Sequence, residues 1–382
     1  MDIDLFDMER YQSLYWYLVE HDLSESGVMP MTIRELLGPA ADAEAFLSGT
    51  WLGYPLSEGS EETRANIAAW YPDAVSSNVT IVNGGSEANF LTLWSLLDPG
   101  DRLAFMVPNY MQGWGLGRQF GKATDTFRLR MGDEGWSLDV DDLNRAVTAK
   151  TKVIMVCNPN NPTGYVLTAP EMDAVITAAD RVGAWVVADE IYRGAELDSD
   201  VSSPTFWGLY DKLVVTSGLS KAFGMPGLRI GWAVSTPGMI QRIWERHDYT
   251  TLAPGLVSDR LAALAMYPDV RESILTRTRL IMRANYPAMD SWLKTHEDIF
   301  TWARPVAGAI QYVKYGLPIN ASKLVERIRQ EKSVLLVPSD MFGLKKGLRF
   351  GFGFDIEMTL KGLALVDEVL ADISREQDQS SA

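Results

Sequence analysis

The stretch that decides the fold reads KVIMVCNPNNPTG, residues 152 to 164. Its first half, Lys152 to Cys157, is a run of apolar and β-branched residues that is typical of a strand buried in a parallel sheet. Its second half, Asn158 to Gly164, contains two prolines, which prevent the strand from continuing. A rigid polar loop at the carboxyl end of a parallel strand lies where open α/β sheets bind their ligands. The stretch therefore predicts both an α/β fold and a ligand site.

The same alternation of short apolar runs with segments of helical period continues on both sides, from about Val79 to about Thr216. Such alternation predicts βαβ units around a mostly parallel sheet. The predicted strands are Val79 to Val82, Arg102 to Val107, Lys152 to Cys157, Ala184 to Ala188 and Lys212 to Thr216. The predicted helices between them are Ala88 to Leu97, Asp139 to Ala149 and Ala169 to Val182.

After Pro237 the pattern becomes mainly helical, and it later mixes helices with short strands up to about Ile373. We therefore expect a large domain of residues 49 to 285 and a smaller α+β domain of residues 286 to 382. Residues 1 to 48 show no strand pattern, so we expect this segment to pack on the small domain. Residues 375 to 382 are expected to form a polar tail.

Composition limits the function of the chain. Its 382 residues carry a formal net charge of −15, so nucleic acid and an anionic membrane surface are not expected as partners. One cysteine and three histidines are too few for a disulfide framework or a cysteine-rich metal site, and no metal is expected. The first ten residues are acidic rather than basic, and no apolar run reaches the ~20 residues of a membrane span. These features predict a cytoplasmic protein.

Glycines stand at one strand-to-helix junction, in Gly84-Gly85-Ser86-Glu87. Glycine lets backbone N–H groups approach an anion closely, and a helix N-terminus adds partial positive charge. The junction therefore predicts a site for a phosphate or a carboxylate. A tight turn capped by Ser86 is an equally simple interpretation.

Two further strand ends carry chemically active side chains. Lys221 lies among small and apolar residues, where desolvation destabilises its ammonium and frees an amine that can form a Schiff base. Asp189 and Tyr192 follow another predicted strand and place a carboxylate and a phenol at the same sheet edge. A surface lysine, a helix-capping aspartate and a surface tyrosine are the simpler alternatives.

Taken together, these motifs resemble the class I/II aminotransferases, which are fold-type I enzymes dependent on pyridoxal 5′-phosphate (PLP). The resemblance rests on Asn158 to Gly164, on Asp189 with Tyr192, and on Ser220-Lys221 with Arg229 eight residues later. It also covers Tyr54 with Gly59 and Arg64, and Arg349 in Leu-Arg-Phe-Gly-Phe. The family fold implied is a mostly parallel, seven-stranded sheet in an αβα sandwich, with a smaller α+β domain.

The resemblance also implies roles for individual residues. Lys221 is the expected Schiff-base lysine and general acid/base, Asp189 the partner of the pyridinium nitrogen, and Arg349 the ligand of the substrate carboxylate. The other expected cofactor contacts are Asn161 and Tyr192 at the phenolic oxygen, Tyr110 on the ring, and Gly85, Ser86, Glu87, Ser220 and Arg229 at the phosphate. Asn161 is also expected at the substrate, and Tyr54 is expected to reach the cofactor of a second subunit in a homodimer.

The chain departs from the family pattern at two places. Gly218 stands where a hydroxyl residue commonly contacts the phosphate, so this contact is lost or is made by Ser217. Residues 23 to 28, LSESGV, replace the usual glycine-x-proline lid. Together with residues 219 to 229 and 246 to 252 they resemble the capreomycidine-synthase branch, whose enzymes cyclise a hydroxylated arginine, whereas the retained Tyr192 is expected of ordinary transaminases.

Three functions remain open at this stage. The first is an aminotransferase that moves the amino group of an L-amino acid to a 2-oxo acid. The second is elimination and ring closure on an arginine-like amino acid, with Glu9, Glu20 and Asp22 as candidate partners of the guanidinium group. The third is a PLP-sensing regulatory domain without turnover. The sequence does not predict the substrate side chain.

Overall fold

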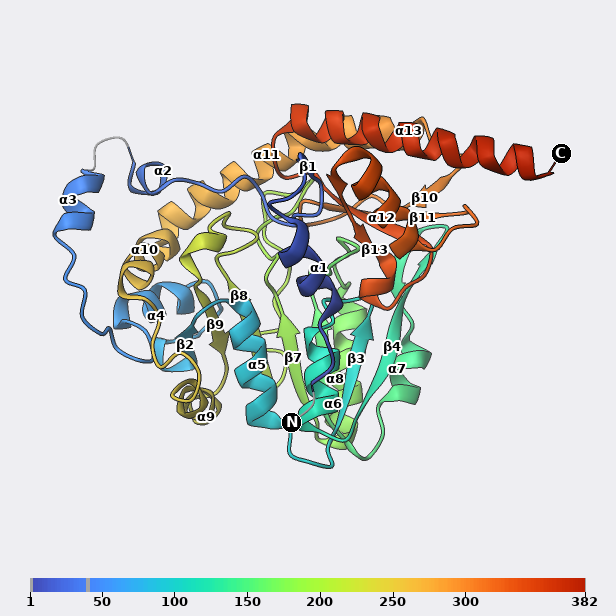
Figure 1. Cartoon of the computed structure of the whole chain (residues 1–382). Coiled ribbons are helices and arrows are strands. Elements are labelled where there is room, and N and C mark those ends of the chain that lie inside the picture. The colour runs from blue at the N-terminus through green and yellow to red at the C-terminus, as the bar shows by residue number, and fades with distance from the viewer. Residues whose placement is uncertain (1–2, 39–41, 382) are drawn as a thin grey trace.

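The largest element of the protein is an eight-stranded sheet in the order β2-β9-β8-β7-β6-β3-β4-β5 (Figure 1). The computed structural model describes residues 3 to 38 and 42 to 381. Neighbours from β8 to β4 pair in parallel, whereas β9 and β5 run antiparallel to their neighbours. The strands are β2 (Val79–Val82), β3 (Arg102–Val107), β4 (Ala123–Gly132), β5 (Gly135–Leu138), β6 (Thr151–Cys157), β7 (Trp185–Asp189), β8 (Leu213–Gly218) and β9 (Gly231–Val234). The prediction of a mostly parallel sheet is confirmed. The sheet has one strand more than the seven expected, the edge strand β5.

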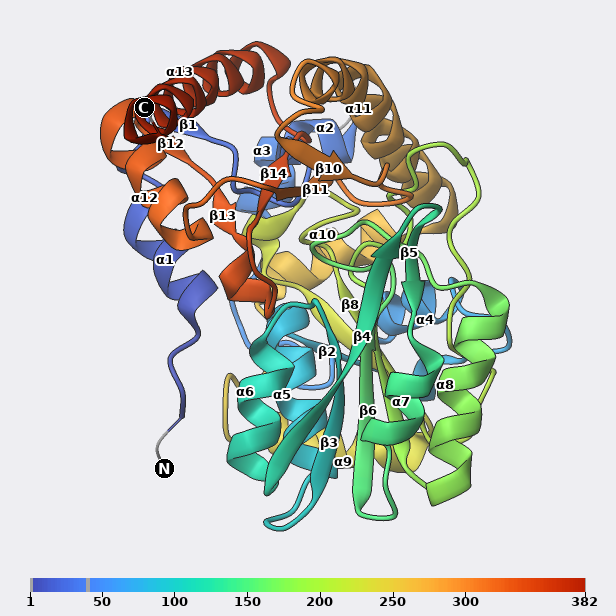
Figure 2. The ribbon, with the colours of Figure 1, turned by 90° about the vertical axis from the view of Figure 1, so that its right-hand side faces the viewer.

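Helices cover both faces of this sheet (Figure 2). Successive side chains of β3 show why: Leu103 and Phe105 pack with helices α5, α6 and α9, whereas Ala104 and Met106 pack into the cluster that contains α7 and α8. Helices α4 and α10 belong to this second cluster as well. The helices are α4 (Glu61–Ala68), α5 (Gly85–Leu96), α6 (Gln112–Phe120), α7 (Val140–Ala146), α8 (Ala169–Val182), α9 (Pro237–His247) and α10 (Leu256–Met266). The predicted αβα sandwich is confirmed.

A second sheet of four strands, β10-β11-β14-β13, lies beside the first and is antiparallel throughout. Its strands are β10 (Phe300–Trp302), β11 (Ile310–Tyr315), β13 (Val337–Pro338) and β14 (Gly347–Gly351). The helices in this part of the chain are α11 (Pro268–Lys294), α12 (Ala321–Lys332) and α13 (Ile356–Ser381). Short 3-10 turns occur at Ser76–Asn78, Pro226–Leu228 and Ser339–Phe342. The division into a large and a small domain remains our proposal, and its boundary at residue 285 falls inside the continuous helix α11. None of the described helices combines the length and the apolar character needed to cross a membrane.

The N-terminal part contains α1 (Asp7–Tyr15), α2 (Ile33–Leu37) and α3 (Ala43–Ser48). It also contains a strand, β1 (His21–Asp22), which pairs in parallel with β12 (Val334–Leu335). The expectation of no strand in residues 1 to 48 is therefore wrong, because two residues are too few to leave a periodic pattern. Residues 375 to 382 were expected to form a polar tail. Helix α13 continues through it to Ser381, because arginine, glutamate and glutamine are good helix formers.

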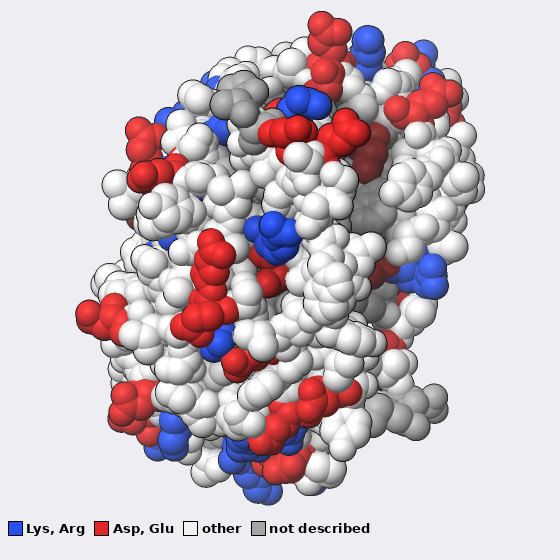
Figure 3. Space-filling view, turned by 90° about the vertical axis from the view of Figure 1, so that its left-hand side faces the viewer, with Lys and Arg blue, Asp and Glu red and all other residues white. Residues whose placement is uncertain are grey.

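The connection from α3 to α4 carries large apolar side chains on the surface. The exposed apolar residues of this connection are Trp51, Leu52, Tyr54 and Leu56, and 75% to 82% of Trp51, Leu52 and Tyr54 is accessible. Figure 3 shows the face on which α3 lies, and wide areas of it carry no charge. Large apolar side chains that are exposed so close together in the chain are a feature expected of a protein interface.

One close backbone contact positions the glycine junction against the sheet. Gly231, the first residue of β9, lies so near to the turn after β2 that a Cβ atom would come within 2.2 Å of the carbonyl carbon of Gly84. Gly84 itself has a φ of +105°, a backbone conformation that L residues other than glycine rarely adopt. The close contact between Gly84 and Gly231 therefore positions the start of α5 against β9.

We predict that Gly231→Ala lowers the free energy of unfolding by about 2 kcal/mol or more, because the added methyl group meets backbone that has no room to move. Urea unfolding followed by circular dichroism measures this loss. Gly238→Ala is the matched control, because in the described structure no atom outside the neighbouring residues and the backbone of α9 lies within 4 Å of the added carbon. This control should be neutral or stabilising by up to ~1 kcal/mol. Equal effects of the two substitutions would contradict the role of the Gly84 contact.

Candidate active site

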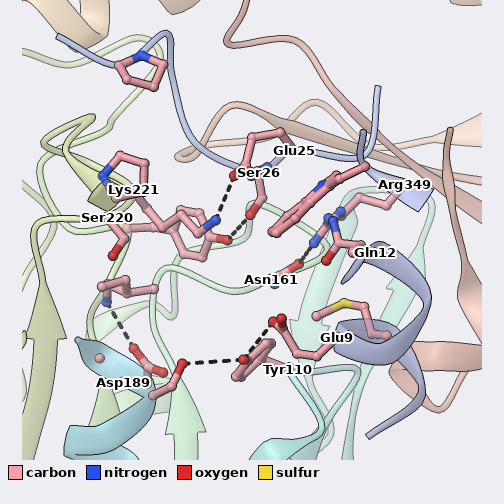
Figure 4. A pocket seen from close by; sticks show the side chains of 18 of the residues that line it. Glu9, Gln12, Glu25, Ser26, Tyr110, Asn161, Asp189, Ser220, Lys221 and Arg349 are labelled. Atoms are coloured by element: carbon pink, nitrogen blue, oxygen red, sulfur yellow. Dashed lines mark hydrogen bonds and ion pairs between the residues drawn. The ribbon is translucent and has the colours of Figure 1, made fainter. Parts of the chain in front are cut away.

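A cavity of about 810 Å³ lies at the carboxyl ends of the parallel strands, under the second sheet and the N-terminal segment (Figure 4). Strands β2, β3, β6, β7 and β8 each end within four residues of a side chain or glycine that lines it. Ten of the predicted site residues line this cavity: Gly85, Ser86, Tyr110, Asn161, Asp189, Tyr192, Ser220, Lys221, Arg229 and Arg349. The fold therefore brings residues from distant parts of the sequence into one place.

Two predicted residues lie outside the cavity lining. The carboxylate of Glu87 points into its own network and accepts hydrogen bonds from the Asn83 amide and from the hydroxyl groups of Thr250 and Thr251. Burial raises its pKa, but the hydrogen bonds, that of His247 foremost, outweigh burial and lower the pKa to about 2. The charged Glu87 side chain thus holds Asn83 close to Thr250 and Thr251. At the phosphate, only the backbone of Glu87 was expected to make a contact. Tyr54 is 81% exposed on the surface.

Asp189 is a buried carboxylate at the end of β7. It accepts hydrogen bonds from Asn89 Nδ2 at 2.8 Å and from the Ile191 amide at 3.1 Å, while Asn89 in turn accepts from Thr216. Burial raises the pKa of Asp189 to about 6, because these neutral donors only partly replace water. Within the described residues no cationic side chain pairs with it. The protonated ring nitrogen of PLP is a group that would satisfy this carboxylate.

Ser220, Arg229 and the start of α5 lie close together at the cavity. Arg229 has a φ of +52°, and its guanidinium lies 3.5 Å from the Ser220 hydroxyl and 3.4 Å from the carbonyl of Asn83. In the described part of the chain it forms no ion pair with a carboxylate. A phosphate fits this arrangement, because helix N–H groups, a hydroxyl and an unpaired guanidinium are all phosphate donors.

The missing hydroxyl at Gly218 has a steric reason. A Cβ atom there would lie 2.8 Å from the carbonyl oxygen of Ile230 and 3.3 Å from the Gly85 amide, so a serine does not fit. Ser217 does not replace it, because it is buried and donates its hydroxyl to the carbonyl of Glu190. Of the two outcomes expected from the sequence, this geometry favours the loss of the contact over its replacement by Ser217.

Arg349 lies on β14 with 1% of its surface exposed. It donates to Asn161 Oδ1 at 2.9 Å and to the carbonyl of Ser24, while its Nε has no hydrogen-bond partner in the described structure. A buried guanidinium without a carboxylate is costly, and a bidentate carboxylate is its best-matched ligand. The α-carboxylate of an amino acid fits this site.

The N-terminal segment closes the cavity through three consecutive residues. Arg349 contacts the carbonyl of Ser24, Lys221 Nζ forms a 2.7 Å ion pair with Glu25 Oε1, and Tyr192 donates to the hydroxyl of Ser26 at 3.0 Å (Figure 4). Sequence reasoning identified residues 23 to 28 as a replacement lid but did not identify Glu25. The available signal for Glu25 was that it is the one charged residue in the LSESGV stretch, whose other residues are small or apolar.

The other acidic candidates are distributed unevenly. Glu9 lines the cavity and accepts a hydrogen bond from Tyr110 Oη at 2.8 Å, and Asp22 lines it while accepting from the Ser24 amide. Glu20 is exposed and outside the lining, with its backbone amide bonded to Ser333. Asn89, which positions Asp189, was also missed, although it lies only one helical turn beyond the predicted glycine junction.

Comparison with known proteins agrees with this geometry. The aminotransferase class I and II family pattern matches residues 27 to 364. The chain belongs to this family. Its enzymes use PLP, so family membership confirms both the predicted fold and the predicted cofactor.

Individual relatives include more than one kind of PLP enzyme. Capreomycidine synthase of Streptomyces vinaceus is 27% identical over 369 residues, covering 96% of this chain and 92% of that protein. An aspartate aminotransferase of Streptomyces avermitilis is 28% identical, covering 87% and 85% of the two chains.

Two solved structures superpose over nearly their whole length. A PLP-dependent aminotransferase from Streptococcus suis has a TM-score of 0.90 and 28% identity, covering 98% of this chain and 99% of that one. The PLP-dependent cyclase OrfR has a TM-score of 0.86 and 27% identity, covering 97% and 98%.

The unpaired Asp189 predicts a pH dependence of stability in the cofactor-free protein. The folded protein holds the Asp189 proton up to about pH 6, whereas the unfolded chain releases it near 3.8, so stability falls as the pH rises through this window. Asp189→Asn removes this contribution. Relative to the wild type, the variant should therefore gain about 2 to 3 kcal/mol between pH 4 and pH 7. Urea unfolding of both proteins at the two pH values measures the gain, and a constant difference would contradict it.

Proposed function

We propose that this chain is an aminotransferase that moves the amino group of an L-amino acid to a 2-oxo acid. One observation carries the proposal. A single cavity holds the Lys221 amine, the buried Asp189 carboxylate and the buried Arg349 guanidinium, and among the described residues Asp189 has no cationic partner and Arg349 forms no ion pair with a carboxylate. Each of these groups matches one part of PLP or of an amino acid.

PLP supplies an aldehyde for attachment and a ring that takes up the electron pair released at the substrate Cα. Lys221 would hold the cofactor through Nζ and, once released by the substrate amine, accept the Cα proton and return it. Asp189 would keep the ring nitrogen protonated, with Asn89 fixing the carboxylate. These two side chains hold the protons on which the reaction depends.

The remaining side chains would orient the two ligands. Asn161 already accepts from Arg349, which leaves its Nδ2 to donate to the phenolic oxygen of the ring together with Tyr192 Oη. Arg349 would bind the α-carboxylate, and Tyr110 would pack against the ring. The phosphate would bind at the N-terminus of α5 with Ser220 and Arg229.

We also propose a homodimer in the cytoplasm. The support for the dimer is the exposed apolar connection between α3 and α4, which contains Tyr54, the residue expected to reach the phosphate of a second subunit. The support for the compartment is the single cysteine, which leaves the chain without a disulfide framework of its own. Both remain predictions.

A second candidate function is elimination with ring closure on an amino acid with a cationic side chain. Glu9 and Asp22, two of the three acidic residues predicted to bind a guanidinium group, are among the carboxylates that line the cavity, and two similar proteins are a synthase and a cyclase by name. We rank it second, because all the groups expected of a transaminase are also present.

Incubation of the PLP-loaded protein with a panel of amino acids, without a 2-oxo acid, tests the proposed function. We predict that at least one amino acid converts bound PLP to its pyridoxamine form and releases an equal amount of 2-oxo acid, measured by absorbance and mass spectrometry. Lys221→Ala should abolish the conversion. Lys212→Ala, which removes a lysine bonded to the carbonyl of Gly183 outside the cavity, should not.

Two other outcomes would contradict transamination. Cyclisation would leave PLP in its aldehyde form and yield an amino acid that has lost water or ammonia. No change with any amino acid would contradict both enzymatic functions and favour the regulatory domain.

A further inference from the structure

The ion pair between Glu25 and Lys221 is not explained by the roles assigned above. Glu25 Oε1 accepts three hydrogen bonds, from Lys221 Nζ at 2.7 Å and from the amides of Ser26 at 2.8 Å and Gly27 at 3.0 Å. The two backbone amides fix the carboxylate independently of the lysine. Glu25 Oε1 is therefore preorganised at the position that Lys221 Nζ reaches.

The backbone around Glu25 is fixed as well. Gly351 on β14 donates to the carbonyl of Leu23, and a Cβ on Gly351 would lie 1.9 Å from the carbonyl oxygen of Glu25. From the other side, Gln12 of α1 donates to Ser24. The segment is packed against the same strand that carries Arg349, whereas Lys221 follows β8. The ion pair thus joins the two sheets across the cavity.

The surroundings favour a proton on the lysine nitrogen. The two side chains are only 25% and 22% exposed, so water screens their attraction weakly. Burial alone would raise the pKa of Glu25, but the charge of Lys221 and the three hydrogen bonds lower it to about 2. Burial lowers the pKa of Lys221 and Arg349 lowers it further, yet Glu25 and Tyr192 together raise it above its usual value.

We propose that Glu25 is a further catalytic residue of this enzyme, the carboxylate that holds the proton on the nitrogen of Lys221. The proposal rests on the proposed function, because it assumes that Lys221 carries the cofactor. On attachment, the Nζ ammonium would first release one proton to solvent, and the resulting amine would form a C=N bond to the aldehyde carbon while the C=O bond breaks and the oxygen leaves as water with the two hydrogens of the amine. Glu25 then stabilises a proton on the attached nitrogen, which makes the neighbouring carbon more reactive toward the substrate amine.

The same contact acts later in the cycle. When Lys221 has been displaced and its Nζ accepts the proton from the substrate Cα, the nitrogen becomes an ammonium. Glu25 Oε1 is preorganised to stabilise that charge, so it favours proton transfer to the lysine. The same ion pair makes the first attachment of PLP less favourable, because Lys221 must lose a proton before it can attach and Glu25 opposes that loss.

The visible absorbance of the PLP-loaded protein tests the proposal, because it depends on whether the nitrogen attached to the cofactor holds a proton. We expect Glu25→Gln to lower the midpoint of this pH titration by roughly one to two pH units. Asp22→Asn is the matched control: it removes a carboxylate from the same cavity, and Asp22 accepts from the Ser24 amide instead of from Lys221. It should shift the midpoint by less than about half a unit.

A midpoint unchanged in Glu25→Gln would overturn the proposal, and so would an equal shift in Asp22→Asn, which would indicate the general field of the cavity. Glu25→Asp keeps the charge, and it also serves if Glu25→Gln fails to fold. Its midpoint should lie between those of the wild type and Glu25→Gln, and below the wild-type value if measured alone; a midpoint equal to that of the wild type would overturn the proposal. Absence of any visible band in the wild type with PLP would refute the proposed function itself.

Discussion

Five parallel strands of the central sheet end at one edge, and the chemistry of this protein depends on that constraint. Because parallel neighbours share a direction, the loops after β6, β7 and β8 meet there, although the sequence separates Asn161 from Lys221 by 60 residues. Glycine at positions 84, 218 and 231 lets the start of α5 lie flush against this edge. The N-terminal segment and β14 then close the cavity from above.

Unpaired charges within this cavity indicate what it binds. Among the described residues, buried Asp189 and buried Arg349 have only neutral hydrogen-bond partners, and Arg229 lies beside a hydroxyl and carbonyl groups. Burying such groups costs free energy that a ligand of opposite charge can return. A cofactor with a cationic ring and an anionic phosphate, together with a substrate carboxylate, supplies all three partners. The acidic chain, with its net charge of −15, thus encloses a site that favours anions at two points.

The sequence predicted those features that local patterns determine. Strands such as Val79–Val82 and helix Ala169–Val182 were located from apolar periodicity, and the loops that follow strands were located from proline and glycine. The ion pair of Glu25 joins residues 196 positions apart, and Asn89 reaches Asp189 across 100 positions. No local pattern encodes such contacts, and the two-residue strand β1 is too short to leave one. The steric reason for Gly218 likewise required the approach of Ile230 and Gly85.

The central claim is that Lys221 carries the cofactor in this cavity. Reduction of the PLP-loaded protein with borohydride makes the bond between lysine and cofactor permanent, and peptide mass spectrometry then locates it. The account predicts one modified peptide, with the phosphopyridoxyl group on Lys221. Modification of a different lysine, or an unmodified Lys221 in a protein that has bound PLP, would contradict it.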